Sequence, residues 1–262
     1  MLPDFTIFGQ TYPVYTLAGL AALFAAAGLA SVRSKKIGLT FSDMLLGIVI
    51  LGAGLLIGGS VLFALVRMPT LWEFRDNFAG SPLAFLQATF GGMIFYGGLF
   101  GALAAMPIYA RLMKRSLSDI ICLVIPTFPL AHSIMRLGCF AAGCCHGIPH
   151  DTLGIAFTRA IGAPNDIPLL PVQLIEAAMN FLIFVIMWQF SKKERKAIHI
   201  LCLYGMSYAA GRFALEFLRG DVARGFVFFL STSQFISILV LLACTIALLC
   251  SKKRGWQKNR TK

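Results

Sequence analysis

Apolar runs long enough to cross a membrane follow one another along most of the chain. About 20 consecutive apolar residues span the hydrocarbon core of a bilayer as one α-helix. The sequence predicts seven such helices, at residues 14–32, 43–66, 88–110, 118–137, 171–190, 198–218 and 233–250. The pattern therefore predicts an all-α fold, a polytopic bundle of seven transmembrane helices that forms a single membrane domain over residues 1–262.

The overall composition supports a membrane protein. Hydrophobic residues make up 58% of the chain and charged residues 13%, and the mean hydropathy is +0.80. A soluble domain of 262 residues has too little interior to bury so much apolar surface. Membrane lipids are therefore the expected surroundings of the chain.

Most of the 23 basic residues lie in alternate connections between the predicted helices or in the C-terminal tail. They form groups at residues 33–36, 111–115, 192–196 and 252–262. Lys and Arg concentrate in short cytoplasmic loops, so this pattern places the N-terminus outside and the C-terminus in the cytoplasm. A net charge of +12 also occurs in nucleic-acid-binding proteins, but charges that flank membrane helices meet anionic headgroups instead. No nucleic-acid partner is expected.

Two connections on the outer side are predicted to form small non-cytoplasmic elaborations. The longer connection covers residues 138–170, and the weak alternation at 152–158 predicts a short strand at most. The other connection, at 68–82, mixes aromatic and charged residues, as interfacial segments do. The N-terminus lacks the basic segment of a cleaved signal peptide, so the first helix is expected to remain.

Charged residues inside the apolar segments are the strongest indication of function. Arg136 lies near the end of the fourth predicted helix, and an arginine at membrane depth costs at least about 2.5–3.5 kcal/mol to insert. Arg212, Glu216 and Arg219 are spaced so that all three share one helical face. Two arginines and a carboxylate can hold an anion, although an Arg–Glu pair can also simply lock two helices together. We expect Arg136 and Arg212 to converge on one phosphate-sized site in the outer half of the membrane.

Two further groups of residues have both a structural and a functional interpretation. Tyr96 precedes Gly97 and Gly98, and glycines at this spacing either pack helices closely or let a lipid headgroup approach the backbone. Gln173 and Glu176 lie at the start of the fifth predicted helix. The helix dipole favours a carboxylate there, which is an alternative to a role in the site.

Cys139, Cys144, Cys145 and His146 lie close together in the sequence. Their C-x4-C-C-H spacing matches no usual zinc motif, and adjacent cysteines seldom bind one metal ion, so no metal is expected. On an oxidising outer face, a disulfide between Cys139 and Cys144 or Cys145 fits better. A reactive thiol near Arg136 is a further alternative. A thiol–disulfide enzyme is disfavoured because the chain has no C-x-x-C motif.

Several of these segments resemble, in the same order, the motifs of one family, the prolipoprotein diacylglyceryl transferases of bacterial inner membranes. Tyr15 in PVYTLAGL is similar to a tyrosine of that family's first helix, and FYGGLFG resembles its His-Gly-Gly-Leu-x-Gly segment. RLGCFAAGCCHG is similar to the family signature Arg-x-Gly-Asn-Phe-x-Asn-Gly-Glu-x-x-Gly, with Arg136 at the essential arginine. Three later motifs of the family also have similar segments in this chain, namely PVQLIEA, GRFALEFLRGD and LSTSQFIS. The last of these segments contains Gln234.

The resemblance implies a multi-pass enzyme of the bacterial inner membrane that needs no cofactor. In this family the lipobox cysteine of a prolipoprotein attacks phosphatidylglycerol, glycerol 1-phosphate leaves, and a diacylglyceryl thioether remains. The residues implied to be catalytic are Arg136, Arg212, Glu216 and Tyr96. The residues implied to contact the substrate are Tyr15, Gly97, Gly98, Gln173, Glu176, Arg219 and Gln234.

The chain departs from the family pattern at positions that bear on the chemistry. Tyr96 stands where the family has a histidine, and Cys144 stands where it has a glutamate. Cys139 and Ala142 replace two asparagines. Binding of the lipid phosphate is therefore expected to carry over better than alkylation of a thiol. Two alternatives stay open: a related enzyme that uses phosphatidylglycerol with another acceptor, and a lipid-binding or lipid-translocating protein without catalysis.

Overall fold

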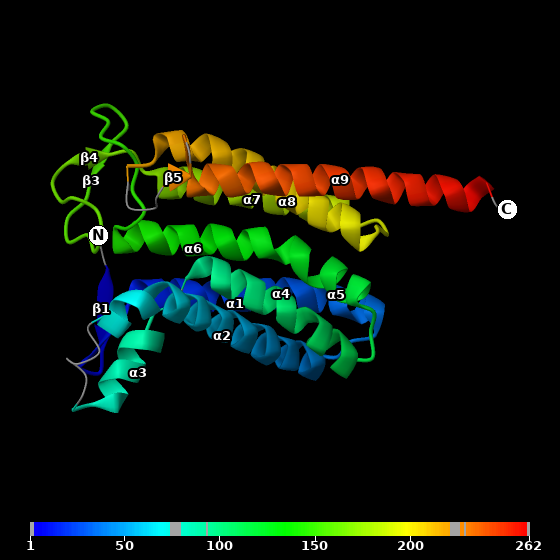
Figure 1. The fold of residues 1–262 in the computed structure, drawn as a ribbon, viewed down its shortest axis with the longest axis horizontal. Coiled ribbons are helices and arrows are strands. Elements are labelled where there is room, and N and C mark those ends of the chain that lie inside the picture. The colour runs from blue at the N-terminus through cyan, green and yellow to red at the C-terminus, as the bar shows by residue number, and fades with distance from the viewer. Residues whose placement is uncertain (1–2, 74–79, 93, 221–225, 228, 261–262) are drawn as a thin grey trace. The chain divides into compact units, whose positions relative to one another are not determined.

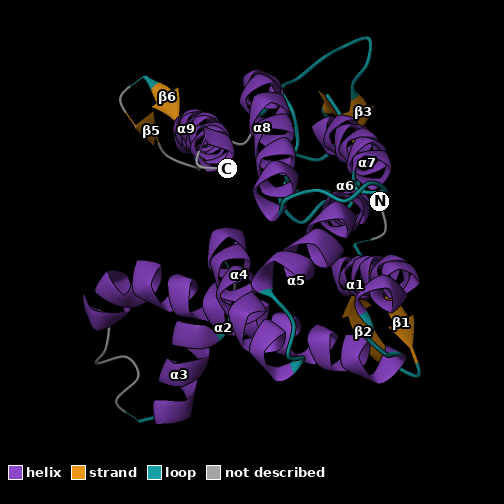
Figure 2. Cartoon of the chain, turned by 90° about the vertical axis from the view of Figure 1, so that its right-hand side faces the viewer, coloured by secondary structure: helices purple, strands orange, loops and turns teal. Residues whose placement is uncertain are grey.

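The structure of the protein is a computed structural model, and most of the chain in it is helical (Figures 1 and 2). It describes residues 3–73, 80–92, 94–220, 226–227 and 229–260, without the side chains at 36, 70, 95–96, 226–227 and 253–260. Internal contacts divide the chain into two compact units, one formed by Met1–Ala30 and Ile121–Lys262 and the other by Ser31–Ile120.

The first unit contains most of the helices. They are α1 (Val14–Ser34), α5 (Leu117–Val124), α6 (Phe128–Ala142), α7 (Val172–Phe190), α8 (Ala197–Leu215) and α9 (Thr232–Arg260), with 3-10 turns at Ile125–Thr127 and Glu216–Leu218. The boundaries between the units fall within α1 and α5. Helix α7 packs on α6 and on α8, and α8 also packs on α9. Figure 1 shows these helices running side by side, so residues from three of them can meet at one place.

Short antiparallel hairpins form in the connections of this unit. β3 (Ile155–Ala156) pairs with β4 (Pro168–Leu169), which confirms the expected short strand, and β5 (Phe226–Val227) pairs with β6 (Leu230–Ser231). The sequence did not predict the hairpin of β1 (Asp4–Ile7) and β2 (Gln10–Pro13). Its turn residues, Phe8 and Gly9, have φ values of 51° and 77°, the left-handed geometry that tight two-residue hairpins require.

The second unit is built on the contact between α2 (Phe41–Glu73) and α4 (Phe95–Leu112), with α3 (Pro82–Phe90) beside α2. The two long helices approach each other through glycines. A Cβ atom at Gly58 would collide with the Gly97 carbonyl oxygen, and one at Gly101 would collide with the Gly54 carbonyl oxygen. The glycine cluster after Tyr96 therefore has the packing role that was one of its two predicted interpretations.

The membrane helices follow the prediction in part. Five helical segments are long and apolar enough to cross a bilayer: Val14–Ser34, Phe41–Pro69, Leu117–Ala142, Val172–Phe190 and Thr232–Lys252. A shorter apolar helix covers Gly97–Leu112. The structure confirms a helical protein with several candidate membrane spans, whereas the number seven and the orientation of the termini stay predictions.

Several predicted boundaries were wrong, since α2 and α9 extend beyond the predicted segments 43–66 and 233–250, and three further differences have local reasons. The segment 88–110 is not one helix, because α3 ends at Phe90, Gly91 and Gly92 follow, and α4 begins at Phe95. The segment 118–137 contains a 3-10 turn at Pro126, which has no N–H to donate, and its helix continues to Ala142. The segment 198–218 leaves the α-helical geometry after Leu215.

We predict that Gly58→Ala destabilises the second unit. Its new methyl group would press against the backbone of α4, and overpacking of this kind costs about 1–3 kcal/mol. Gly52→Ala is the matched control on the same helix, because no heavy atom lies within 4 Å of its Cβ position. Thermal unfolding in detergent should give a lower midpoint for Gly58→Ala only. Equal midpoints would mean that this helix contact is looser than the structure shows.

Candidate functional site

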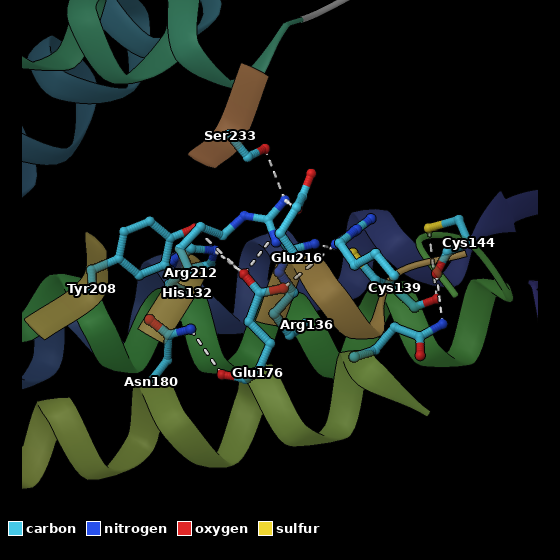
Figure 3. A network of polar contacts seen from close by, with 12 residues as sticks. His132, Arg136, Cys139, Cys144, Glu176, Asn180, Tyr208, Arg212, Glu216 and Ser233 are labelled. Carbon is cyan, nitrogen blue, oxygen red and sulfur yellow. Dashed lines mark hydrogen bonds and ion pairs between the residues drawn. The ribbon is translucent and has the colours of Figure 1, made fainter. Parts of the chain in front are cut away.

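A fully buried carboxylate, Glu176, lies near the start of α7 and collects polar groups from other elements (Figure 3). Arg136 Nη2, from α6, lies 3.0 Å from Glu176 Oε1, and Arg219 Nη1 lies 3.7 Å from Oε2. The Tyr208 hydroxyl donates to Oε1 at 3.4 Å, and His132 Nε2 lies 3.8 Å from the same oxygen. Glu176 therefore belongs to a buried polar cluster, and the helix dipole alone does not account for its position.

A second ion pair lies at the end of α8. Arg212 Nη2 lies 2.6 Å from Glu216 Oε2, which confirms the pair expected from their i, i+4 spacing. The same nitrogen donates to Ser233 Oγ at 3.0 Å. Arg212 also interacts electrostatically with Glu176. The two ion pairs are thus parts of one buried polar cluster.

The prediction that Arg219 shares a helical face with Arg212 and Glu216 was wrong. The α-helix ends at Leu215, a 3-10 turn covers Glu216–Leu218, and Arg219 has an extended backbone. An antiparallel bridge between Gly147 and Arg219 holds this extended segment. Arg219 consequently pairs with Glu176 on another helix.

The buried cluster carries more positive than negative charge. The side chains of Arg136, Arg212 and Arg219 are 13%, 4% and 4% exposed, and the ion pairs seen among the described residues join them to two carboxylates, Glu176 and Glu216. Among the described residues, Arg136 Nε and Arg212 Nη1 are buried without a hydrogen-bond partner. An excess positive charge with unused donors is suited to one bound anion.

Two predicted substrate contacts have structural partners. Gln173 is buried on the first turn of α7, where its Nε2 donates to the Cys144 carbonyl oxygen at 2.7 Å, while its Oε1 has no hydrogen-bond partner among the described residues. Gln234 and Ser231 form a reciprocal cap at the start of α9, with N–H···O distances of 3.1 and 3.2 Å. This cap explains the position of Gln234, and its contact with a substrate stays a prediction.

The remaining predicted residues lie on other elements. Tyr15 lies on α1, and its ring is 3.7 Å from the position that a Cβ atom on Gly138 would take. Gly97 and Gly98 belong to the second unit, where they pack α4 against α2. The side chain of Tyr96 lies outside the described part of the structure.

Sequence reasoning missed Tyr208, Asn180 and Ser233. Asn180 is fully buried, and its Nδ2 donates to the Glu176 carbonyl oxygen at 2.8 Å. Helical spacing contained a usable signal, because Asn180 lies four residues after Glu176 and Tyr208 lies four residues before Arg212. Ser233 carried no such signal, since its partner Arg212 lies on another helix.

The cysteine cluster lies directly beside these charges. The sulfur atoms of Cys139, Cys144 and Cys145 are within 4.8 Å of one another, and in this structure no disulfide joins them. Arg136 Nη1 lies 3.8 Å from Cys139 Sγ. Hydrogen bonds from the Cys139 and Cys144 thiols lower the pKa of the Cys145 thiol, and the charges of Arg136 and Arg219 act in the same direction.

Comparisons with known proteins identify the family. Residues 5–250 match the family model described as "Prolipoprotein diacylglyceryl transferase". A Clostridium tetani protein named phosphatidylglycerol–prolipoprotein diacylglyceryl transferase is 34% identical over 241 residues, which cover 91% of this chain and 92% of that protein. Proteins of the same name from Acinetobacter baumannii and, numbered 2, from Clostridium perfringens are 31% and 29% identical. These matches cover 87% and 79% of this chain, and 84% and 78% of the relatives.

We predict that Glu176→Gln strongly destabilises the first unit. Removing one partner of a buried ion pair leaves a charge without compensation and costs about 3–5 kcal/mol, and here two arginines lose their carboxylate. Thermal unfolding of the purified protein measures the change. Glu194→Gln, in the exposed connection after α7, is the control and should not change the midpoint. Equal midpoints for the two variants would contradict the role given to Glu176.

Proposed function

The chain belongs to the prolipoprotein diacylglyceryl transferase family, and we propose that it transfers the diacylglyceryl group of phosphatidylglycerol to the lipobox cysteine of a prolipoprotein. The names of relatives that match over most of their length give these two substrates. The proposed enzyme uses phosphatidylglycerol as donor and prolipoprotein as acceptor, and it needs no cofactor.

The excess positive charge of the buried cluster is the observation that carries this proposal. Cleavage of phosphatidylglycerol leaves a glycerol phosphate, whose negative charge must be stabilised as the bond breaks. Guanidinium groups already fixed by Glu176 and Glu216 can stabilise this charge without reorganising. The unused donors Arg136 Nε and Arg212 Nη1 are available for phosphate oxygens.

The reaction needs two events at one carbon of the lipid glycerol. The acceptor sulfur forms a bond to C3 of the diacylglyceryl group as the bond from that carbon to the phosphate oxygen breaks. Arg136 and Arg212 stabilise the departing phosphate, and Glu216 orients Arg212. The proton of the acceptor thiol must pass to a base, and Tyr96, at the position of the family histidine, is proposed for this step. A tyrosine of ordinary pKa, about 10, needs a nearby positive charge to act as a base at neutral pH.

The other predicted residues are proposed to shape the lipid site. Gln173 retains an unused buried acceptor beside the cysteine cluster, which supports a contact with the headgroup. Arg219 and Glu176 position the phosphate-binding groups. Tyr15, Gly97, Gly98 and Gln234 are proposed substrate contacts on the strength of the family motifs.

The proposed membrane arrangement has seven spans in one membrane domain. The apolar helix Gly97–Leu112 and α8 would add two spans to the five long ones. The alternating basic connections support an N-terminus outside and a C-terminus in the cytoplasm. The proposed location is the bacterial inner membrane, with the site toward its outer half.

We predict that Arg136→Gln and Arg212→Gln each reduce the release of glycerol phosphate about 10²–10³-fold, as for the loss of one group that stabilises transition-state charge. The assay uses purified protein, phosphatidylglycerol and a lipobox peptide. Arg159→Gln is the control, because its side chain is 67% exposed and pairs only with Asp4 among the described residues. Release without any peptide would indicate another acceptor. No release by the wild-type protein would instead favour a lipid-binding protein.

We predict that Tyr96→Phe lowers the rate of the same reaction about 10²–10⁴-fold, the usual contribution of a general acid or base. The substitution keeps the ring, so lipid binding should change little. Tyr96→His restores the family residue and should recover activity with the lipobox peptide. Equal rates for wild type and Tyr96→Phe, at matched lipid occupancy, would exclude a role of the hydroxyl in the chemical step.

A further inference from the structure

Three thiols meet where α6 ends. Cys139 is on the last turn of the helix and is buried, and the half-buried Cys144 and Cys145 come after Gly143, the residue that caps the helix end. Their three sulfur atoms lie within 4.8 Å of one another. We propose that Cys139, Cys144 and Cys145 form a binding site for one metal ion of the class that prefers thiolate ligands, to which Zn²⁺ and Cu⁺ belong.

The spacing of the sulfur atoms fits such an ion. A zinc–sulfur bond is about 2.3 Å long, so thiolates on one tetrahedral or trigonal ion stand about 3.8–4.0 Å apart. The distances between the three sulfur atoms are at most 4.8 Å. Each distance therefore has to shorten by no more than about 1 Å to reach the spacing of thiolates on one ion. Side-chain rotation can supply this movement.

The backbone explains how adjacent cysteines share one site. Gly143 and Cys145 have φ values of 68° and 58°, so the chain turns back on the helix end. The Cys144 amide donates to the Cys139 carbonyl oxygen at 3.1 Å, which closes this turn. A left-handed conformation costs a residue with a side chain about 1–2 kcal/mol. Strain of this kind persists where the surrounding structure or a function requires it, and here its effect is to bring the third sulfur to the other two.

The surroundings favour a thiolate-bound cation. Three thiolates around Zn²⁺ carry a net negative charge, and the guanidinium of Arg136 lies 3.8 Å from Cys139 Sγ to offset it. Thiolates prefer soft or borderline ions, whereas Mg²⁺ and Ca²⁺ prefer oxygen ligands. His146 is next in the sequence, but it is not among the residues whose ligand atoms lie here within 4.8 Å of one another. Three sulfurs therefore define the site.

A disulfide, which the sequence favoured, accounts for less of this geometry. It would use two of the sulfur atoms and leave the third without a function, although all three meet at one point. A bound ion also has a structural consequence. It would tie the helix that carries Arg136 to Cys144, whose carbonyl oxygen accepts a hydrogen bond from Gln173 on the helix that carries Glu176.

Metal titration of the full-length protein in detergent, under reducing conditions and after chelation, tests the proposal. Zn²⁺, Cu⁺ and, as a spectroscopic probe, Co²⁺ are added separately, with Mg²⁺ as the negative control. We expect one retained Zn²⁺ or Cu⁺ per chain and a thiolate-to-cobalt charge-transfer band. Cys144→Ser should weaken metal binding by at least about 100-fold, since even the loss of outer-shell partners costs about 10–100-fold. Retention of Cu⁺ but not Zn²⁺, or the reverse, identifies the ion within the class.

Cys145→Asn separates loss of a ligand from loss of the fold. Asparagine tolerates the left-handed conformation of this position, so this variant should stay folded and lose the ion. Cys250→Ser, at an exposed position far along α9, is the matched control and should bind metal like the wild type.

Three results would overturn the proposal. The first is a folded, reduced wild-type protein that retains neither Zn²⁺ nor Cu⁺. The second is equal metal binding by the wild type, Cys144→Ser and Cys145→Asn. The third is an intact mass, measured after alkylation without reductant, that shows a disulfide between two of these cysteines together with no metal binding after reduction.

Discussion

The need to compensate buried charge at Glu176 determines how the described part of the first unit is held together. A carboxylate with no exposed surface is costly in an apolar protein unless positive groups and hydrogen bonds surround it. Arg136 provides one such group from α6, and Arg219 provides another from the segment after α8. One side chain on α7 therefore links segments that lie far apart in the sequence.

The same compensation leaves the cluster ready for an anion. Each of the two carboxylates pairs with at least one arginine, and among the described residues of the cluster the arginines outnumber the carboxylates. An arrangement that only stabilised the helices would be expected to balance its charges and to use its buried donors. The cluster instead keeps unused guanidinium nitrogens on Arg136 and Arg212. Its stability and its proposed chemistry thus depend on the same ion pairs, which is why substitutions there need a stability measurement beside a rate.

The connection between α6 and α7 joins this cluster to the cysteines. Backbone bonds fix it at both ends: the Cys144 amide bonds to the end of α6, and the Gly147 amide donates to the Leu170 carbonyl oxygen at 3.0 Å just before α7. The residues that replace the family's asparagines and glutamate lie in or just before this connection. These departures from the family motifs therefore lie close in sequence to Arg136, which pairs with Glu176 in this structure.

Local patterns in the sequence determined the helical membrane character, the helix at Val172–Phe190 and the Arg212–Glu216 pair. The predicted start of that helix was one residue too early. These features depend on residues within one or two turns, so spacing alone predicts them. Only the tertiary structure decided that Arg136 and Arg219 share Glu176, because their partner lies about 40 residues away along the chain and on another element. The meeting of three sulfurs likewise depends on two left-handed residues, Gly143 and Cys145, and side-chain spacing contains no information on backbone angles.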